Sequence, residues 1–297
     1  MKLKKLEYDD IKNVVDFIKS NPQKLSLYNP ATISLWNGCI YDVYFTIEDN
    51  ILIIAEVEIE NSNNKRLMLP VGKKIAPEKL KDIMNLLGYK YVYYVSEEYI
   101  NENRNELEQI FAISRQEEYD DYVYLTSELS ELKGSKYSPK RNLINQFLKN
   151  YSDLFEIKPL AVENIDDVIE LTNNVYKQIS TEKAFNILAC EKKAIENIKK
   201  LWGLLEFKGV CIYINKQLKS FAIGSRLNPE TYTLNFEKAD KNIKGLYQFV
   251  DREFAKLVRN DCLYINKESD LGKELLKKAK ESYHPVFRLN SYILELK

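Results

Sequence analysis

The order of predicted secondary structure in residues 151–297 restricts the fold of this chain more than any other feature. Short β-branched and aromatic runs between turn residues predict strands, and apolar residues three or four apart predict helices. The order is strand, two helices, three strands, helix, strand, helix and strand, over residues 155–160, 163–180, 191–207, 210–215, 217–227, 231–238, 245–258, 262–268, 270–283 and 286–296. It predicts an α/β fold built on a mixed sheet.

The same order resembles the GNAT acyltransferase fold, in which a mixed sheet splays between its central strands and opens a cleft. The first half repeats a similar order less regularly, with a helix at 9–20, a hairpin at 39–59 and a helix at 76–88 that ends at Gly88. Repetition at about half of the 297 residues predicts tandem GNAT domains. We expect an N-terminal domain over 1–150 and a C-terminal domain over 151–297.

Longer stretches carry a closer resemblance. Residues 124–151, "YLTSELSELKGSKYSPKRNLINQFLKNY", and residues 235–257, 264–287 and 292–296 resemble a bacterial family related to the C-terminal domain of phosphatidylglycerol lysyltransferase. The chain is more distantly similar to the Fem peptidoglycan aminoacyltransferases. The resemblance implies transfer of an aminoacyl group from a charged tRNA. Membrane lysyltransferases carry a long transmembrane segment ahead of this domain, and no such segment is present here, so the acceptor need not be a lipid.

A basic segment at residues 132–151 marks the expected domain boundary. It contains five cations and no acidic residue: Lys133, Lys136, Lys140, Arg141 and Lys149. Cations at a helix start oppose the helix dipole, so Lys140 and Arg141 are placed as if an anion such as a tRNA phosphate docks there. Lys140, Arg141 and Asn145 resemble a family pattern with altered spacing. A solvated helix face between domains is the alternative.

Two acidic stretches follow strands of the second half. On strand 231–238, Glu237 alternates with apolar residues, leaves on the polar side near the expected cleft, and could bind an amino group or act as a general base. A strand-end ion pair with Lys238 is its alternative. At the end of strand 262–268, Asn266 and Glu268 are candidate ligand contacts, whereas Asp270, which follows the strand, is expected to cap the next helix.

The helix predicted over 270–283 ends in "KESYHP", which includes the single histidine of the chain. Leu271, Leu275, Leu276, Ala279 and Tyr283 are expected to face the core. The lysyltransferases end this helix with a lysine, an aromatic residue and a proline, and Lys280, Tyr283 and Pro285 occupy similar positions. Lys280 is therefore a candidate cation for a carbonyl or phosphate oxygen, and Tyr283 a candidate proton donor. His284 is a candidate substrate contact, and its alternative, which the pattern favours, is a helix cap or a surface residue.

The turn before helix 245–258 is where a CoA cofactor would bind in a GNAT fold. GNAT enzymes that use acetyl-CoA cradle pyrophosphate on a glycine-rich turn at this place, and here "DKNIKGLYQ" has one glycine. Backbone amides beside Lys244 and Gly245 could still bind an anion such as acyl-CoA. The four cysteines lack a CxxC pair, so no metal site is expected.

Bulk properties narrow the remaining choices. Basic and acidic residues both number 44, so overall charge does not favour wholesale binding to nucleic acid or membrane. The N-terminus lacks the pattern of a signal peptide, and a cytoplasmic location is expected. No Ser-His-Asp or Cys-His arrangement is recoverable from one histidine and isolated cysteines, so hydrolysis by such a site is not expected. Three hypotheses stay open: an aminoacyltransferase that uses charged tRNA, a non-catalytic module that binds tRNA or peptide, and a CoA-dependent N-acyltransferase acting on a small amine.

Overall fold

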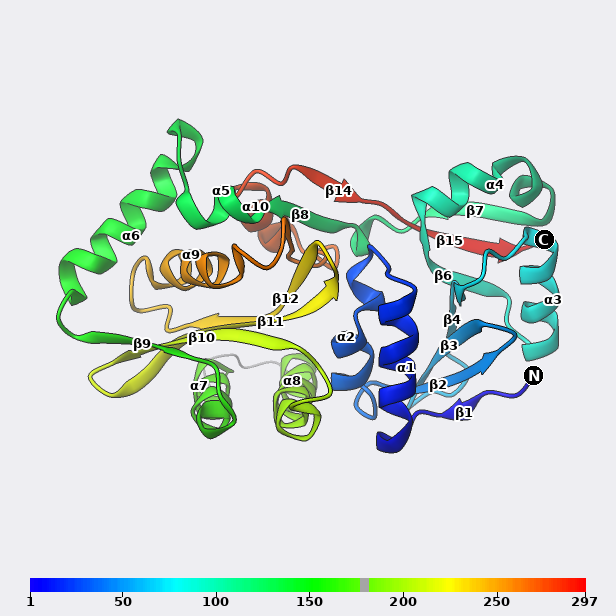
Figure 1. Cartoon of the computed structure of the whole chain (residues 1–297), viewed down its shortest axis with the longest axis horizontal. Helices are drawn as coiled ribbons and strands as arrows, with labels where there is room; N and C mark the ends of the chain where they lie inside the picture. The colour runs from blue at the N-terminus through cyan, green and yellow to red at the C-terminus, as the bar shows by residue number, and fades with distance from the viewer. Residues whose placement is uncertain (177–181) are drawn as a thin grey trace. The chain divides into compact units, whose positions relative to one another are not determined.

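The structure is a computed structural model that describes residues 1–176 and 182–297. It divides into two compact α/β units (Figure 1). The first comprises Met1–Tyr122, Glu268–Lys278 and Phe287–Lys297, and the second comprises Val123–Lys267 and Ala279–Val286. This division differs from the expected boundary at residue 150, because residues 123–150 belong to the second unit and the end of the chain returns to the first.

The first unit is built on a mixed sheet of eight strands in the order β1-β2-β3-β4-β6-β15-β7, with β5 paired to β3. The strands are β1 (Lys4–Lys5), β2 (Tyr41–Glu48), β3 (Ile51–Glu58), β4 (Lys65–Met68), β5 (Val71–Gly72), β6 (Tyr91–Ser96), β7 (Phe111–Arg115) and β15 (Ser291–Leu296). The helices are α1 (Tyr8–Ser20), the short η1 (Ser26–Tyr28), α2 (Pro30–Leu35), α3 (Pro77–Leu87), α4 (Glu97–Ile110) and η2 (Glu117–Tyr119).

Local sequence signals account for much of this unit. The hairpin between β2 and β3 turns at Asp49 and Asn50, which both have a positive φ, as a tight hairpin turn requires. Helix α3 ends at Gly88, whose left-handed conformation (φ 69°) confirms the predicted cap. Alternate residues of β3, with Ile53 fully buried, pack against α3 and α4.

The second sheet has the order β14-β8-β13-β12-β11-β10-β9. Its strands are β8 (Asp121–Leu125), β9 (Phe155–Pro159), β10 (Phe207–Ile214), β11 (Gln217–Asn228), β12 (Thr231–Ala239), β13 (Tyr264–Asn266) and β14 (Phe287–Leu289). The helices are α5 (Thr126–Glu131), η3 (Ser135–Tyr137), α6 (Ser138–Tyr151), η4 (Val162–Asn164), α7 (Ile165–Tyr176), α8 (Glu182–Leu201), α9 (Leu246–Val258) and α10 (Glu274–Glu281). Figure 1 shows α9 on one face of β10–β12, with α7 and α8 on the other.

The sheet of the second unit forks between its central strands. β12 and β13 run parallel and pair only through Thr231, Tyr232 and Thr233. β12 then continues to Ala239 beside β11, with which it stays paired over most of its length. Glu237 therefore lies beyond the point where β12 and β13 separate.

Two expectations for the C-terminal residues are wrong. The final strand predicted over 286–296 is two strands in different sheets, β14 and β15. The helix predicted from residue 270 begins at Glu274, because a turn at Leu271 (φ 52°) and Gly272 (φ 68°) precedes it. Leu275 is consequently 83% exposed, so the apolar residues of this helix do not form the core face that the pattern predicts.

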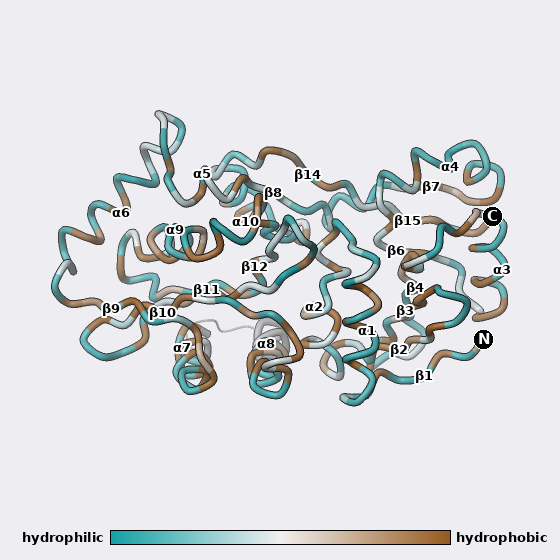
Figure 2. Tube along the Cα trace, viewed as in Figure 1, coloured by the Kyte–Doolittle hydropathy of each residue, from teal (hydrophilic) through white to brown (hydrophobic). Residues whose placement is uncertain are grey.

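Helices α7 and α9 follow the predicted pattern more closely, whereas the helix predicted over 191–207 is α8, which begins at Glu182 and ends at Leu201. Seven residues of α9 are buried, and Figure 2 shows apolar and polar stretches along it, as expected for an amphipathic helix. The helix predicted over 163–180 is α7, and its predicted end at 177–180 lies outside the described residues. Within residues 1–176 and 182–297, each helix is either too short or too polar to span a bilayer.

Candidate active site

A group of charged side chains gathers on the α9 side of the forked sheet. We call it the lysine cluster. Four members lie on named elements: Glu237 on β12, Lys140 on α6, Asp251 on α9 and Lys280 on α10. The other two are Lys267, which follows β13, and Tyr283, which follows α10. All of them belong to the second unit. Segments far apart in the sequence thus bring three lysines and two carboxylates together.

A buried ion pair between α9 and the end of β13 stands at the centre of the cluster. The Nζ atom of Lys267 lies 2.5 Å from each carboxylate oxygen of Asp251. The side chains of Asp251 and Lys267 are only 3% and 8% exposed. Because a buried charge is tolerated only when it is paired, this contact fixes the position of both groups.

Tyr283 lies between two of the lysines. The Nζ atoms of Lys140 and Lys267 are 3.9 and 4.3 Å from the centroid of its ring. Lys140 also donates a hydrogen bond to Ser282 Oγ at 2.6 Å. Burial, together with the Asp251 and Glu237 carboxylates, raises the pKa of the Tyr283 phenol well above its usual value. Tyr283 is therefore a weak proton donor, and the geometry favours a positioning role for it.

Lys280 reaches the cluster from the last turn of α10. Its Nζ atom donates a hydrogen bond to the backbone carbonyl of Lys267, and its own carbonyl accepts one from Tyr124 Oη at 2.7 Å. These bonds tie α10 to the segment that follows β13. The ammonium of Lys280 lies within electrostatic range of Glu237, whose pKa it lowers.

Glu237 is the member of the lysine cluster whose carboxylate has no hydrogen-bond or ion-pair partner among the described residues. Its cross-strand partner on β11 is Ala222, two residues before Gly224, where a Cβ would meet Phe254 of α9 at 2.5 Å. Residues directly opposite or two apart share a face, so Glu237 points toward α9. The half-buried carboxylate forms no hydrogen bond or ion pair with any described residue. Lys238 instead pairs with Glu191 at 2.9 Å, which rules out the expected strand-end pair with Glu237.

The electrostatics of the cluster suit proton transfer at Glu237. Burial, with a further contribution from Asp251, raises the pKa of Glu237 to about 8, against the opposing effect of the lysines. A carboxyl group with this pKa gains and loses a proton near neutral pH. At pH 7 it is mostly protonated, so three lysines then face one ionised carboxylate. The excess positive charge can stabilise an oxyanion or hold a phosphate.

The rest of the basic segment does not join the cluster. Arg141 Nη1 donates hydrogen bonds to the carbonyls of Leu132 (2.5 Å) and Gly134 (2.6 Å), so it holds the loop before α6. Lys133 and Lys136 pair with Glu131 and Glu128, which precede the segment in sequence, at 2.8 and 2.9 Å. Asn145 and Lys149 are exposed on α6. Of these residues, only Lys140 reaches the cluster.

The residues after β13 and α10 are divided between the units. Asn266 is fully buried beside Thr233 on β12, whereas Glu268 lines a cavity of the first unit. Asp270 does not cap α10; its carboxylate accepts hydrogen bonds from Gly272 N (2.8 Å) and Tyr122 Oη (2.6 Å) and closes the turn ahead of the helix. His284 is exposed, with Nε2 3.3 Å from the Lys136 carbonyl.

The start of α9 has a packing explanation that the sequence does not reveal. Gly245 has φ 85°, and a Cβ there would lie 2.0 Å from the carbonyl oxygen of Leu143 on α6. The backbone of α6 thus packs directly against the turn where GNAT enzymes cradle pyrophosphate. Lys244 is exposed. A cofactor role for Lys244 and Gly245 stays a prediction, which this close packing disfavours.

Sequence reasoning missed Asp251 and Lys267. Asp251 lies three, four and seven residues before Phe254, Ala255 and Val258, which are all buried. An acid at the edge of an apolar stripe was thus visible in the sequence and pointed to a buried partner. Lys267 directly follows a buried strand, but no local signal pairs it with Asp251.

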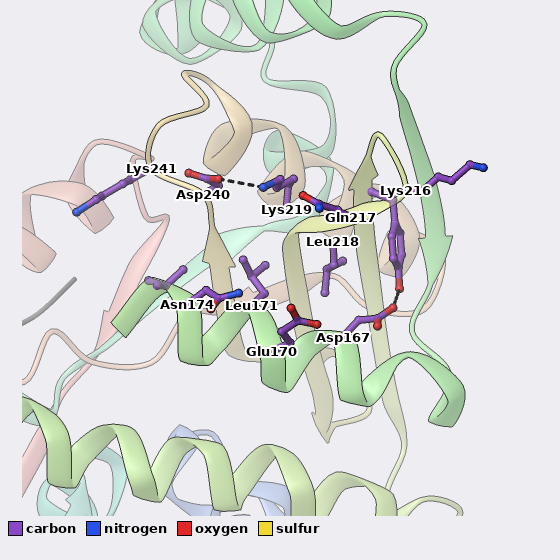
Figure 3. Close-up of a pocket in the computed structure, with 12 residues that line it drawn as sticks. Asp167, Glu170, Leu171, Asn174, Lys216, Gln217, Leu218, Lys219, Asp240 and Lys241 are labelled. Carbon is purple, nitrogen blue, oxygen red and sulfur yellow. Dashed lines mark hydrogen bonds and ion pairs between the residues drawn. The ribbon is translucent and has the colours of Figure 1, made fainter. Parts of the chain in front are cut away.

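A second cavity, of about 400 Å³, lies between α7 and the β10–β11 hairpin (Figure 3). Two polar contacts lie within its lining: Tyr213 Oη donates a hydrogen bond to Asp167 at 2.5 Å, and Lys219 pairs with Asp240 at 3.5 Å. None of the residues that the sequence nominates for function line it. Over the described ranges, no group of three histidine, cysteine or acidic side chains is arranged to hold a metal ion.

Comparison with known families identifies the fold. A family model described as "Phosphatidylglycerol lysyltransferase, C-terminal" matches residues 25–295. A curated relative, an uncharacterised protein of Mycoplasmoides gallisepticum, is 22% identical over 175 residues, and the match covers 59% of this chain and 56% of that protein. The chain thus matches little more than half the length of that relative.

Solved structures agree over nearly the whole chain. A conserved protein of unknown function from Bacteroides thetaiotaomicron is 27% identical, with a TM-score of 0.86 and full coverage of both chains. The L-PGS of Bacillus licheniformis has 10% identity and a TM-score of 0.66, covering 99% of this chain and 93% of that one. FemX has 8% identity and a TM-score of 0.60, covering 100% and 98%. The tandem GNAT fold expected from the sequence is confirmed.

Proposed function

Because the chain belongs to the family of the phosphatidylglycerol lysyltransferase C-terminal domain, a GNAT-like acyltransferase fold, we propose that it transfers an aminoacyl group from a charged tRNA to an amine or hydroxyl acceptor. The observation that carries this proposal is the lysine cluster. It combines an unpartnered carboxyl group whose pKa is about 8 with three ammonium groups on the α9 side of a forked sheet.

An aminoacyl ester is already activated, so the protein needs mainly to position the reactants and stabilise charge. The ester carbonyl gains negative charge when the acceptor attacks it. In the proposed reaction Lys280 stabilises that oxyanion, while Lys140 and Lys267, held by Tyr283 and Asp251, keep the surroundings positive. The donor is a polyanion, and a positive site also favours its terminal phosphates.

Glu237 moves the proton in this scheme. Its carboxylate takes a proton from the acceptor amine or hydroxyl as the new bond to the acyl carbon forms. When the tetrahedral intermediate collapses, the acyl carbon–oxygen bond to the ribose breaks, and Glu237 returns the proton to the departing ribose oxygen. A pKa near the working pH suits a group that must act first as base and then as acid. Charged tRNA is a cytoplasmic donor, so the reaction is placed there.

The observations favour a charged-tRNA donor but do not select one chemical class of acceptor. The family description names phosphatidylglycerol as the acceptor of the relatives for which the family is named. A lipid hydroxyl, a peptide amine and a small amine are all nucleophiles that Glu237 could deprotonate. The CoA-dependent alternative draws support from the GNAT fold alone, because the Leu143 carbonyl crowds the turn at Gly245.

Label transfer tests the proposal. The full chain is incubated with tRNA charged with radiolabelled amino acids and, in separate arms, with phosphatidylglycerol vesicles, a peptidoglycan-precursor fraction and a small-amine fraction. We expect label to move to one acceptor, with rates at least a hundredfold lower for Glu237→Gln and Lys280→Met. Glu230→Gln and Lys149→Met, which change exposed residues of the same unit, serve as matched controls.

The other outcomes separate the rival functions. Salt-sensitive binding of charged tRNA without transfer in any arm would favour a binding module. A thermal shift with acyl-CoA, together with transfer from acyl-CoA, would favour the CoA-dependent reaction. Normal transfer by Glu237→Gln and Lys280→Met would show that the lysine cluster is not the site.

A further inference from the structure

The first unit contains a cavity of about 280 Å³ that the proposed transfer reaction does not use. It lies beside η1 and α2, over β2, β3 and β4, and every residue that lines it belongs to the first unit. The apolar part of its lining is formed by Leu27, Ile33, Trp36, Ile40, Val43 and Leu271. The polar part includes the carboxylates of Glu56 and Glu268 and the guanidinium of Arg66. The cavity therefore fits a small ligand with one apolar part and one charged part.

The charged end is formed by Glu56 of β3 and Arg66 of β4. These residues are directly opposite each other in the antiparallel register, so their side chains share a face of the sheet. They form no ion pair with each other, nor does either with any other described residue. The Tyr94 hydroxyl lies between them: it accepts a hydrogen bond from Arg66 Nη1 at 2.9 Å and donates one to Glu56 Oε2 at 3.4 Å.

Aromatic side chains hold the guanidinium of Arg66 in place. Its carbon atom lies 4.8 Å from the Tyr41 ring centroid and 5.7 Å from that of Tyr93. Its hydrogen bonds to described residues use Nη1 alone, toward the hydroxyls of Tyr94 and Tyr119. The Nε and Nη2 donors are left over, and a fixed guanidinium with spare donors is suited to bind a carboxylate.

The backbone at Tyr94 is shaped to place its hydroxyl there. Tyr94 has φ 58°, a left-handed conformation that is costly for a bulky aromatic residue. The register of β6 with β15 shifts at the same place, between Val95 and Val92. A bulge of this kind re-aims a side chain, and such strain often accompanies a binding site.

The Thr32 side chain supplies a further polar group. Thr32 lines the cavity, and its Oγ1 atom is buried with no hydrogen-bond partner among the described residues. A buried hydroxyl without a partner is costly.

We propose that this cavity binds a free α-amino acid with an apolar side chain. Its carboxylate would contact Arg66, its ammonium would contact Glu56, and its side chain would lie on the wall that includes Trp36. An anion alone would place a negative charge beside Glu56, and a cation alone would place a positive charge beside Arg66. A zwitterion satisfies both groups at once. Burial raises the pKa of Glu56, against the opposing effects of the Arg66 guanidinium and the Tyr94 hydroxyl.

This site is independent of the transfer reaction, since none of its residues belongs to the lysine cluster. Trp36 provides the assay, because the chain has two tryptophans and the other, Trp202, lies in the second unit. In a Trp202→Phe background, the full chain is titrated with L-leucine and L-methionine, with L-leucinamide, and with N-acetyl-L-leucine. We expect saturable changes of Trp36 emission with the free amino acids. Binding of the two blocked derivatives should be at least about tenfold weaker, because each lacks one charge.

Variants test the two contacts separately. Arg66→Gln and Glu56→Gln should each weaken L-leucine binding at least about tenfold. Arg104→Gln, which changes an exposed arginine of α4, should leave it unchanged. Isothermal titration of the unaltered chain gives the same comparison of ligands if a variant fails to fold. No binding of either amino acid, or equal binding of N-acetyl-L-leucine or L-leucinamide, would overturn the proposal.

Discussion

The ion pair between Asp251 and Lys267 gives the sharpest test of how the lysine cluster is held. Replacing Asp251 with leucine leaves the Lys267 ammonium buried beside two other lysines. Removing one partner of a buried pair typically costs about 3–5 kcal/mol of the free energy of unfolding. With side chains only 3% and 8% exposed and both carboxylate oxygens at 2.5 Å, this pair belongs in that range. Lys267→Met alone should lower the free energy of unfolding by a similar amount, because it leaves the Asp251 carboxylate buried without its ion-pair partner.

The double variant tests whether the cost of each single variant comes from leaving one charge buried without a partner. Asp251→Leu with Lys267→Met replaces the pair by apolar side chains, which is often neutral. The Tyr283 hydroxyl then also loses its interaction with the Asp251 carboxylate, which we expect to cost about 1–3 kcal/mol. We therefore expect the double variant to be more stable than either single variant. Urea unfolding followed by Trp202 emission, in a Trp36→Phe background, reports on the second unit. A double variant that loses the sum of the single losses would refute the account.

Three further results are expected. The transfer rate should rise with pH and level off above about pH 8, because Glu237 must be ionised to accept a proton, and Glu237→Gln should remove this rise. The folded protein binds the Glu237 proton more tightly than the unfolded chain does, so the free energy of unfolding of the wild type should fall as pH rises from the usual glutamate pKa of 4.5 to about 8. Relative to wild type, Glu237→Gln should gain on the order of 4 kcal/mol in free energy of unfolding between about pH 5 and pH 9. A difference in stability between the two proteins that does not change with pH would contradict this expectation. Gly245→Ala should destabilise the second unit by at least about 1 kcal/mol in urea unfolding, because of its positive φ and the Leu143 carbonyl, whereas the matched change Gly134→Ala, where nothing lies within 4 Å of the added carbon, should cost less.

Local patterns predicted most elements, because they depend on residues close in sequence. The apolar stripe of α9 and the turn at Asn215 and Lys216, which both have a positive φ, are examples. Long-range pairing was not predictable in this way. Nothing in the composition of β8 or β15 indicates that β8 joins the second sheet while β15 inserts between β6 and β7 of the first.

The candidate site was predicted in part for the same reason. Alternation along β12 placed Glu237 on the polar side, and the resemblance to lysyltransferases singled out Lys280. The roles of both residues stay predictions. Arg141 was nominated for an anion, but its partners are backbone carbonyls that only the folded loop brings near. Asp251 is visible in the sequence as an acid beside an apolar stripe, but its partner Lys267 was not predictable, because a pair formed across 16 residues leaves no periodic signal.

The proton affinity of Glu237 is the property on which the proposed chemistry rests, and it can be measured directly. A carbon-13 NMR titration of the glutamate side-chain carboxyls, with Glu237 assigned by its absence in Glu237→Gln, follows this group from acid to alkaline pH. We expect a midpoint near pH 8. A midpoint near 4.5, the ordinary value for a glutamate, would show that burial does not outweigh the effect of the three lysines, and would contradict the role of Glu237 as the proton carrier.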